Sequence, residues 1–147
     1  YDFNDNDYVY GLGAWNEDRF SAYERQVREV FGYGRRLVDL ERQVLNAEVG
    51  LGFRQAVRRE GTREDESIFR LASDYSLTLS ETSSFDQTLT IESGSGNTYV
   101  ESVSRLTADV WQDIALVLSY TIKHNSTVPI DTEKTDAFTA ISLEYSF

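Results

Sequence analysis

The sequence predicts an all-β fold, an antiparallel up-and-down meander of about eight strands. Apolar and polar side chains alternate with a period of two along most of the chain, which places the two sets on opposite faces of extended strands. Proline occurs once, at Pro129, while Val, Thr, Tyr, Phe and Ser are frequent, a composition that favours strands. Helical periodicity is weak. The best helical candidate, residues 20–40, is interrupted by Gly32 and Gly34 and fits period-two alternation better.

Length and composition limit the classes of protein to consider. The 147 residues are enough for one domain, residues 1–147. The chain has no cysteine, which argues against disulfides and thiolate metal sites. Its net charge of −11 argues against nucleic acid as a partner. There is no apolar run of about 18 residues that would suit a transmembrane helix. Because Met is absent even at position 1, we expect a mature chain or a fragment.

The first four expected strands follow a turn at residues 4–7 and span residues 8–17, 23–37, 44–57 and 66–79. Polar or charged loops separate the first strand from the second and the third from the fourth. The third strand alternates most regularly: its apolar face carries Leu45, Ala47, Val49, Leu51 and Phe53, and its polar face carries Asn46, Glu48, Gly50, Gly52 and Arg54.

The last four expected strands span residues 84–92, 99–110, 114–125 and 135–147. Each again opposes an apolar face to a polar one. The final strand ends the chain on aromatic side chains, which outer-membrane barrels place at the membrane interface. Its apolar face resembles the assembly signal that bacterial barrel-insertion machinery recognises, and it carries Ile141, Leu143, Tyr145 and Phe147.

The connections alternate between short and long, as they do in outer-membrane barrels with short periplasmic turns and longer extracellular loops. The short connections are residues 4–7, 38–41, 80–83 and 111–113, and the long ones are residues 16–22, 58–65, 93–98 and 124–134. The sequence therefore predicts a β-barrel in the bacterial outer membrane, with lipid and the barrel-assembly machinery as partners. Residues 1–3 resemble the end of an earlier strand, so we expect the C-terminal portion of a larger, N-terminally truncated barrel.

Several runs, in their order and spacing, resemble the YdiY-like family of salt-induced outer-membrane proteins, a family of unknown biochemical function. The runs include residues 10–12, 18–21, 32–37, 48–54, 74–76, 97–99, 124–129 and 133–147. The resemblance covers nearly the whole chain. It implies a longer barrel, a structural or narrow-pore role related to salt or envelope stress, and neither catalytic residues nor cofactors to carry over.

The polar faces supply the candidate site. Charged side chains of both signs are expected to point into the barrel, and two interpretations remain open: a salt-bridge network that fills the lumen, or a polar passage for an unidentified small solute. The lumen-facing candidates are Glu48, Arg54, Arg70, Asp74, Glu92, Arg105, Asp109, Lys123 and Glu144.

Two features of the pattern need a structural explanation. Paired glycines recur in the first three strands, and we expect all six on the polar face, where they would let the sheet bend. They are Gly11, Gly13, Gly32, Gly34, Gly50 and Gly52. Glu29 falls on the apolar face near mid-strand, and we expect a β-bulge to turn it inward.

Other classes of protein remain as alternatives. A soluble lipocalin-like barrel that binds a small apolar ligand would give the same alternation with the apolar face inward. A membrane-barrel hydrolase would need a nucleophile, a base and an orienting group, for which Ser126, His124 and Asp131 are the weak candidates; we expect no enzyme. The acidic run at residues 2–7 lacks the Gly and Glu positions of an EF-hand loop, so we expect a plain turn there, with a weak surface cation site as the alternative.

Overall fold

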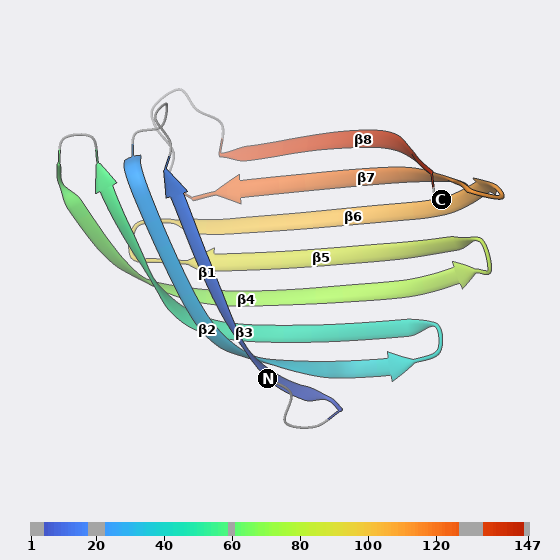
Figure 1. Ribbon diagram of the computed structural model, residues 1–147, viewed down its shortest axis with the longest axis horizontal. Coiled ribbons are helices and arrows are strands. Elements are labelled where there is room, and N and C mark those ends of the chain that lie inside the picture. Colours follow the sequence, from blue (N-terminus) through green and yellow to red (C-terminus); the bar gives the residue numbers. More distant parts are fainter. Residues whose placement is uncertain (1–4, 18–22, 59–60, 127–133, 146–147) are drawn as a thin grey trace.

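The computed structural model describes residues 5–17, 23–58, 61–126 and 134–145. These residues form one eight-stranded sheet whose spatial order follows the sequence (Figure 1). The strands are β1 (Asp7–Glu17), β2 (Tyr23–Leu40), β3 (Gln43–Arg58), β4 (Arg63–Ser80), β5 (Ser83–Ser93), β6 (Thr98–Trp111), β7 (Ile114–Asn125) and β8 (Thr135–Tyr145).

The predicted all-β antiparallel meander is confirmed. Every strand pairs antiparallel with its sequence neighbours, and the described residues contain no helix. In this part of the chain β1 and β8 are the two edges of the sheet. The stub at residues 1–3 and Phe147 lie outside the described residues.

The predicted alternation of connection lengths is also confirmed. Two-residue turns at Glu41–Arg42, Glu81–Thr82 and Gln112–Asp113 join strands at one end of the sheet. The connections at the opposite end are longer, and the longest one separates β7 from β8. The turn between β2 and β3 also bonds to the next strand: Thr78 N–H of β4 donates a hydrogen bond of 2.8 Å to the carbonyl of Arg42.

The start of β4 differs from the prediction. Residues 63–65 were expected in a charged loop, but β4 begins at Arg63 and pairs there with Val57 of β3. Strands β2, β3 and β4 therefore continue past the end of β5. Opposite charges directly across the ladder, such as Arg54 and Glu66, stabilise such an extension.

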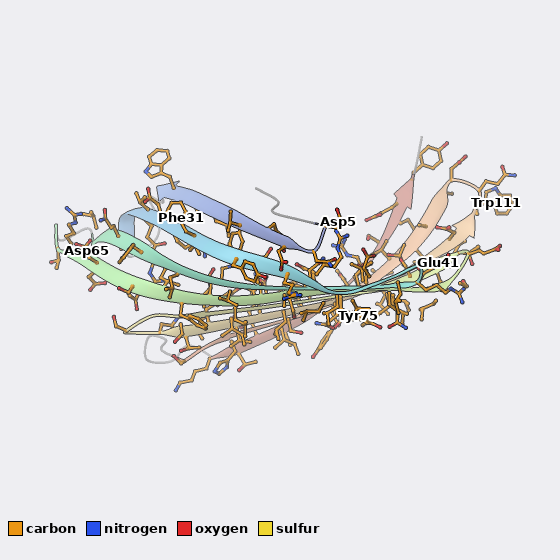
Figure 2. All side chains as sticks on the ribbon, turned by 90° about the horizontal axis from the view of Figure 1, so that it is seen from below. Asp5, Phe31, Glu41, Asp65, Tyr75 and Trp111 are labelled. Carbon is orange, nitrogen blue, oxygen red and sulfur yellow. The ribbon has the colours of Figure 1, made fainter. Side chains whose placement is uncertain are left out.

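The sheet is strongly curved, and the charged face is the concave one. Arg28 of β2 and Glu92 of β5 form an ion pair of 2.6 Å although β3 and β4 lie between them. Neighbouring strands are about 4.8 Å apart, so three steps across a flat sheet would separate them by about 14 Å. Only curvature toward this face brings the two side chains together, and the curved sheet is visible in Figure 2.

The two faces differ in burial as well as in charge. The few buried apolar side chains of the described residues belong to the concave face in the strand register, and they are Val30, Ala56, Ile68, Ala72 and Val117. The convex face instead exposes large apolar side chains, with Phe31 at 70%, Leu51 at 69% and Phe53 at 66%. The apolar face therefore points outward and lies uncovered.

The glycine prediction is wrong for β1. Tyr10 lies opposite Gly32, whereas Gly11 lies opposite Phe31; Gly11 and Gly13 therefore share the convex face, and the β1 tyrosines share the concave one. The cause is that β1 carries apolar side chains on both faces, so alternation alone does not fix its phase. Pairing with β2 fixes it.

The predicted bulge at Glu29 is also wrong. The pairing of β2 with β3 runs without a shift through Arg28↔Arg54, Glu29↔Phe53 and Val30↔Gly52. Register shifts occur instead near the two ends of β2, between Tyr23 and Arg25 and between Arg36 and Val38. Glu29 therefore stays exposed on the convex face beside Phe53.

We predict that Gly52→Ala destabilises the sheet by about 1–3 kcal/mol, the usual cost of overpacking. A Cβ atom at Gly52 would overlap the Glu29 carbonyl oxygen and would lie 2.8 Å from the Val30 Cα. Gly13→Ala is the matched control, because its Cβ would meet nothing within 4 Å. Urea unfolding monitored by circular dichroism measures both variants, and equal midpoints would contradict the prediction.

Candidate functional site

Arg70, on β4, contacts three partners on the concave face. Its Nη1 donates hydrogen bonds to Glu48 Oε2 at 2.7 Å and to Tyr10 Oη at 3.1 Å. Its Nε lies 3.8 Å from Glu92 Oε1. The side chain is only 14% exposed, so these contacts replace water around the guanidinium. One residue thus links β1, β3, β4 and β5.

The carboxylate partners of Arg70 extend the network on either side. Glu48 Oε1 accepts a hydrogen bond of 2.8 Å from the Tyr8 hydroxyl. Both oxygens of Glu92 accept hydrogen bonds of 2.6 Å from Arg28 Nη1. We call this set the concave charge network; its members are Tyr8, Tyr10, Arg28, Glu48, Arg70 and Glu92.

Glycines make room for the tyrosines of this network. Gly34 and Gly32 of β2 lie opposite Tyr8 and Tyr10, and a Cβ atom at either glycine would overlap the opposite ring. At Gly50 of β3, a Cβ atom would lie 2.7 Å from the Tyr10 hydroxyl oxygen. The tyrosine rings therefore lie over bare backbone, where the hydroxyl of Tyr10 reaches Arg70 across β2 and β3.

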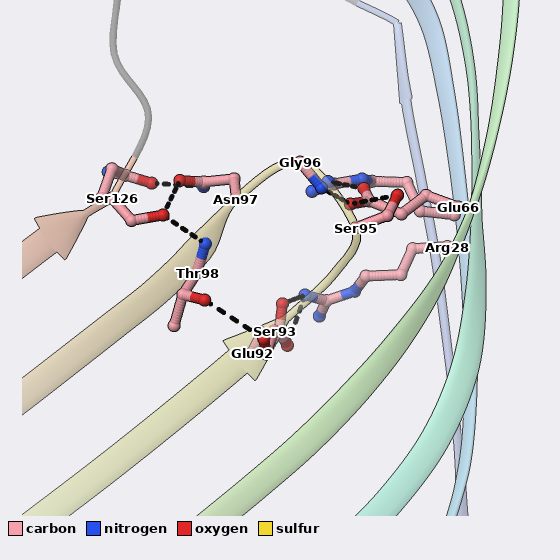
Figure 3. Close-up of polar contacts among 11 residues, drawn as sticks. Arg28, Glu66, Glu92, Ser93, Ser95, Gly96, Asn97, Thr98 and Ser126 are labelled. Carbon is pink, nitrogen blue, oxygen red and sulfur yellow. Dashed lines mark hydrogen bonds and ion pairs between the residues drawn. The ribbon is translucent and has the colours of Figure 1, made fainter.

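A second ion pair, Arg54–Glu66, lies closer to the long-connection end of the sheet. Glu66 also binds the loop between β5 and β6: Oε1 accepts a hydrogen bond of 2.9 Å from Gly96 N–H and one of 3.4 Å from Ser95 Oγ. Figure 3 shows this carboxylate at the loop, with the Arg28–Glu92 pair below it.

The chemistry of the concave charge network is that of mutual neutralisation. Arg28 and Arg70 balance Glu48 and Glu92, and each charge has a partner within the network. Charge-assisted hydrogen bonds of this kind are about twice as strong as neutral ones. Across the described ranges, no group of three or more His, Asp or Glu side chains is placed to hold a metal ion. The arrangement suits bracing a curved wall.

The structure brings only some of the nine predicted lumen-facing residues together. Glu48, Arg70 and Glu92 meet in the network, and Arg54 pairs with Glu66 beside it. Whether any of them faces a lumen stays a prediction.

The other predicted candidates lie apart from the network. Asp74 accepts a hydrogen bond of 3.1 Å from Thr88, and Lys123 lies 3.6 Å from Glu101. Arg105 lies opposite Asp86, while Asp109 and Glu144 both flank Ala115.

Sequence reasoning missed four partners: Tyr8, Tyr10, Arg28 and Glu66. Arg28 and Glu66 were detectable from the alternation. Arg28 is four residues from Gly32, and Glu66 is four residues from Arg70, so each lies on the same face of its strand as that residue. Tyr8 and Tyr10 were not, since their face depends on the β1–β2 register.

The residues considered for a hydrolase have other hydrogen-bond partners. His124 Nδ1 lies 2.7 Å from Thr135 Oγ1 on the neighbouring strand. Ser126 Oγ accepts a hydrogen bond of 2.8 Å from Thr98 N–H and donates one of 3.2 Å to Asn97 Oδ1. Asp131 lies outside the described residues.

The predicted assembly signal lies on the edge strand β8. Ile141, Leu143 and Tyr145 are 72%, 70% and 60% exposed, and they share one face with Leu118 and Leu116 of β7. The remaining member of the signal, Phe147, is outside the described residues.

A family model described as "Protein of unknown function, DUF481" matches residues 1–147. The chain belongs to the DUF481 family. This confirms the YdiY-like resemblance, since the chain is also 26% identical to "Uncharacterized protein YdiY" of Escherichia coli (strain K12). That match covers 99% of this chain and 58% of the relative, so the chain spans less than two thirds of that protein.

No solved structure matches this DUF481 chain. Within the described part of the chain, no helix has the length and apolarity needed to cross a bilayer. The family match and the antiparallel sheet establish the family and the all-β fold of this chain.

We predict that Arg70→Ala destabilises the protein by about 3 kcal/mol, because it leaves two half-buried carboxylates without their shared cation. The control is Arg36→Ala, which removes an exposed pair with Asp39 (side chains 42% and 54% exposed) and should cost about 0–1 kcal/mol. Urea unfolding measures both. Similar losses for the two variants would mean that Arg70 is not a central brace.

Proposed function

We propose that this DUF481 chain forms part of the wall of a bacterial outer-membrane β-barrel, with its convex face in lipid and its concave charge network inside. One observation carries the proposal: the face that bends outward is apolar and exposed, and the face that bends inward is charged and internally paired. Outer-membrane barrels have this arrangement of faces.

The direction of curvature distinguishes this proposal from a soluble lipocalin-like barrel. Such a barrel would enclose its apolar side chains and expose its charges to water. Here Phe31, Leu51 and Phe53 are at least 66% exposed on the convex side, while Arg70 on the concave side is 14% exposed. In water, the apolar face would be a large uncovered patch of the kind that monomeric proteins avoid.

The length of the apolar band supports the same proposal. On β4, exposed apolar side chains extend from Phe69 to Leu79, and the span of residues 69–79 matches the roughly 9–11 residues of a tilted transmembrane strand. The more charged segment of β4 that precedes Phe69, Arg63 to Ile68, would then project beyond the membrane. The projection lies at the long-connection end, where extracellular loops are expected.

Three polar side chains on the convex face bond to one another, which is compatible with lipid on that face. Gln87, Ser102 and Ser104 lie there in the strand register. The Gln87 amide donates a hydrogen bond of 2.9 Å to Ser102 Oγ and accepts one from Ser104 Oγ. These side chains satisfy one another, which removes most of the cost of placing them in hydrocarbon.

Of the two roles proposed for the interior, bracing is better supported than conduction. Arg70 and Arg28 span the concave face and are paired with Glu92 and Glu48. Side chains that cross a narrow barrel fill it. A structural role in the envelope, under the salt or envelope stress that the family resemblance implies, is therefore our proposal.

The test is fractionation of the full-length protein, followed by conductance measurements in planar bilayers. The proposal expects recovery in detergent extracts of the outer membrane, a heat-modifiable band on gels, and little conductance. Recovery from the periplasm without detergent would overturn the membrane location. A steady, large conductance would overturn the brace and favour a passage for solutes.

If the convex face lies in lipid, arginine substitutions on the two faces at a similar height along neighbouring strands should have unequal costs. Leu118→Arg, on the convex face at mid-strand, should cost about 2–4 kcal/mol of folding into lipid vesicles. Ser142→Arg, on the concave face of neighbouring β8, should cost far less because that face does not contact lipid in the proposed arrangement. Refolding titrations in vesicles measure both. In a protein whose convex face meets water, Leu118→Arg would be harmless.

The terminal strand generates a prediction about assembly in cells. Deleting Phe147 removes apolar contact only at a strand end, where depth-dependent costs fall to about 0–1 kcal/mol. We therefore expect the full-length deletion variant to refold in micelles but to accumulate unassembled in the periplasm. Normal outer-membrane levels of the variant would show that residues 141–147 are not an assembly signal.

A further inference from the structure

The loop between β5 and β6, residues 94–97, is held from one side by its neighbour β7. Gly94 N–H donates a hydrogen bond of 2.9 Å to the Asn97 carbonyl and closes the loop. Asn97 Nδ2 donates to Asn125 Oδ1 at 3.0 Å, and Ser126 Oγ donates to Asn97 Oδ1 at 3.2 Å. These bonds fix the β6 side of the loop (Figure 3).

The other side of the loop contacts Glu66 of β4. The pairing of β4 with β5 ends at Phe69↔Ser93, so Glu66 belongs to the part of β4 that extends past the end of β5. Its side chain is 13% exposed. It accepts hydrogen bonds from Gly96 N–H and Ser95 Oγ, and it also binds Arg54 of β3. One carboxylate thus joins the β3–β4 hairpin to the β5–β6 loop.

The loop sequence is fitted to this carboxylate. A Cβ atom at Gly94 would overlap Glu66 Oε1, so any larger residue there would require the carboxylate to shift away from the loop backbone. The Gly94 backbone itself is not in the left-handed region, in contrast to Gly61 with φ of 81°. The requirement for glycine at position 94 is therefore one of space.

We propose that Glu66 is a clasp: as an anion it fixes residues 94–97 to the extended β3–β4 hairpin, and its protonation or removal detaches the loop from that hairpin while its bonds to the β7 side remain. The contacts that carry this inference are independent of the membrane location proposed above.

The surroundings of Glu66 favour its charged form. Arg54 of β3 lies directly opposite Glu66, and Arg28 of β2 lies opposite Arg54. The acidic and titratable groups nearest on the same face are Glu64 on β4, Glu92 on β5 and Tyr99 on β6. Glu92 is already paired with Arg28 and Arg70, so the cation in direct contact with Glu66 is Arg54.

The pKa of Glu66, which lies outside the apolar span of residues 69–79, is lowered from its ordinary value. Burial acts to raise this pKa, but the hydrogen bond from Gly96 and the charge of Arg54 outweigh it. A lowered pKa means that the anion contributes stability above the ordinary pKa and loses it as the pH falls through the lowered one. The clasp is therefore closed at neutral pH and opens in acid.

The decisive experiment is amide hydrogen exchange on the full-length protein, in the detergent or buffer in which it is recovered. In Glu66→Ala, amides of residues 94–97 should exchange at least about tenfold faster than in the wild type. Tenfold corresponds to 1.4 kcal/mol, close to the lower end for a hydrogen bond to a charged group. Asp65→Asn is the control, since Asp65 pairs with exposed Arg63 and should leave these amides unchanged.

A second variant and a pH series make the test independent of one substitution. Gly94→Ala keeps the carboxylate but displaces it, and it should accelerate the same amides while β7 stays protected. In the wild type, exchange corrected for its intrinsic pH dependence should rise in acid, and in Glu66→Ala it should not. Unchanged loop exchange in both variants would overturn the clasp, as would equal acceleration by Asp65→Asn.

Discussion

The contact of two tyrosine rings with bare glycine backbone is the constraint on which the rest of this structure depends. Tyr8 and Tyr10 of β1 lie over Gly34, Gly32 and Gly50, where any Cβ atom would push the rings away. The rings lie on the concave side, where the Tyr10 hydroxyl reaches Arg70 across β2 and β3. The same curved face brings Arg28 to Glu92.

The buried core of the described residues is small, and the charge network has a different role from it. Few described side chains are fully buried, among them Val30, Ile68 and Val117, and this burial contributes little compared with that of a soluble domain of equal length. Paired charges on a half-buried face do not add much stability by themselves, but losing one partner leaves another charge uncompensated. The network therefore acts mainly by disfavouring other shapes of the sheet. The large apolar side chains of the convex face are not buried within the described sheet.

Much of the fold could be predicted from the sequence, because period-two alternation and turn residues are local signals. β3 shows this best: its faces follow directly from Leu45 to Arg54. The prediction failed where the signal was not local. The phase of β1 depends on its pairing with β2, and Glu29 stays outward because an uninterrupted ladder fixes its side. The partners in the site were harder still, since Arg28 and Glu92 meet only through curvature, which no single strand encodes.

The direction of curvature nevertheless leaves a trace in the sequence. Side chains on a concave face converge, so that face needs small residues between its large ones, whereas side chains on a convex face diverge and tolerate bulk everywhere. On β3 the small residues Gly50, Gly52 and Ala56 share the face of Glu48 and Arg54, while the other face carries Val49, Leu51 and Phe53. An alternating strand by itself fits both a soluble barrel and a membrane barrel. On β3 the small residues share the charged face, which agrees with the charged face being the inner one and leaves the apolar side chains of that strand on the outer face.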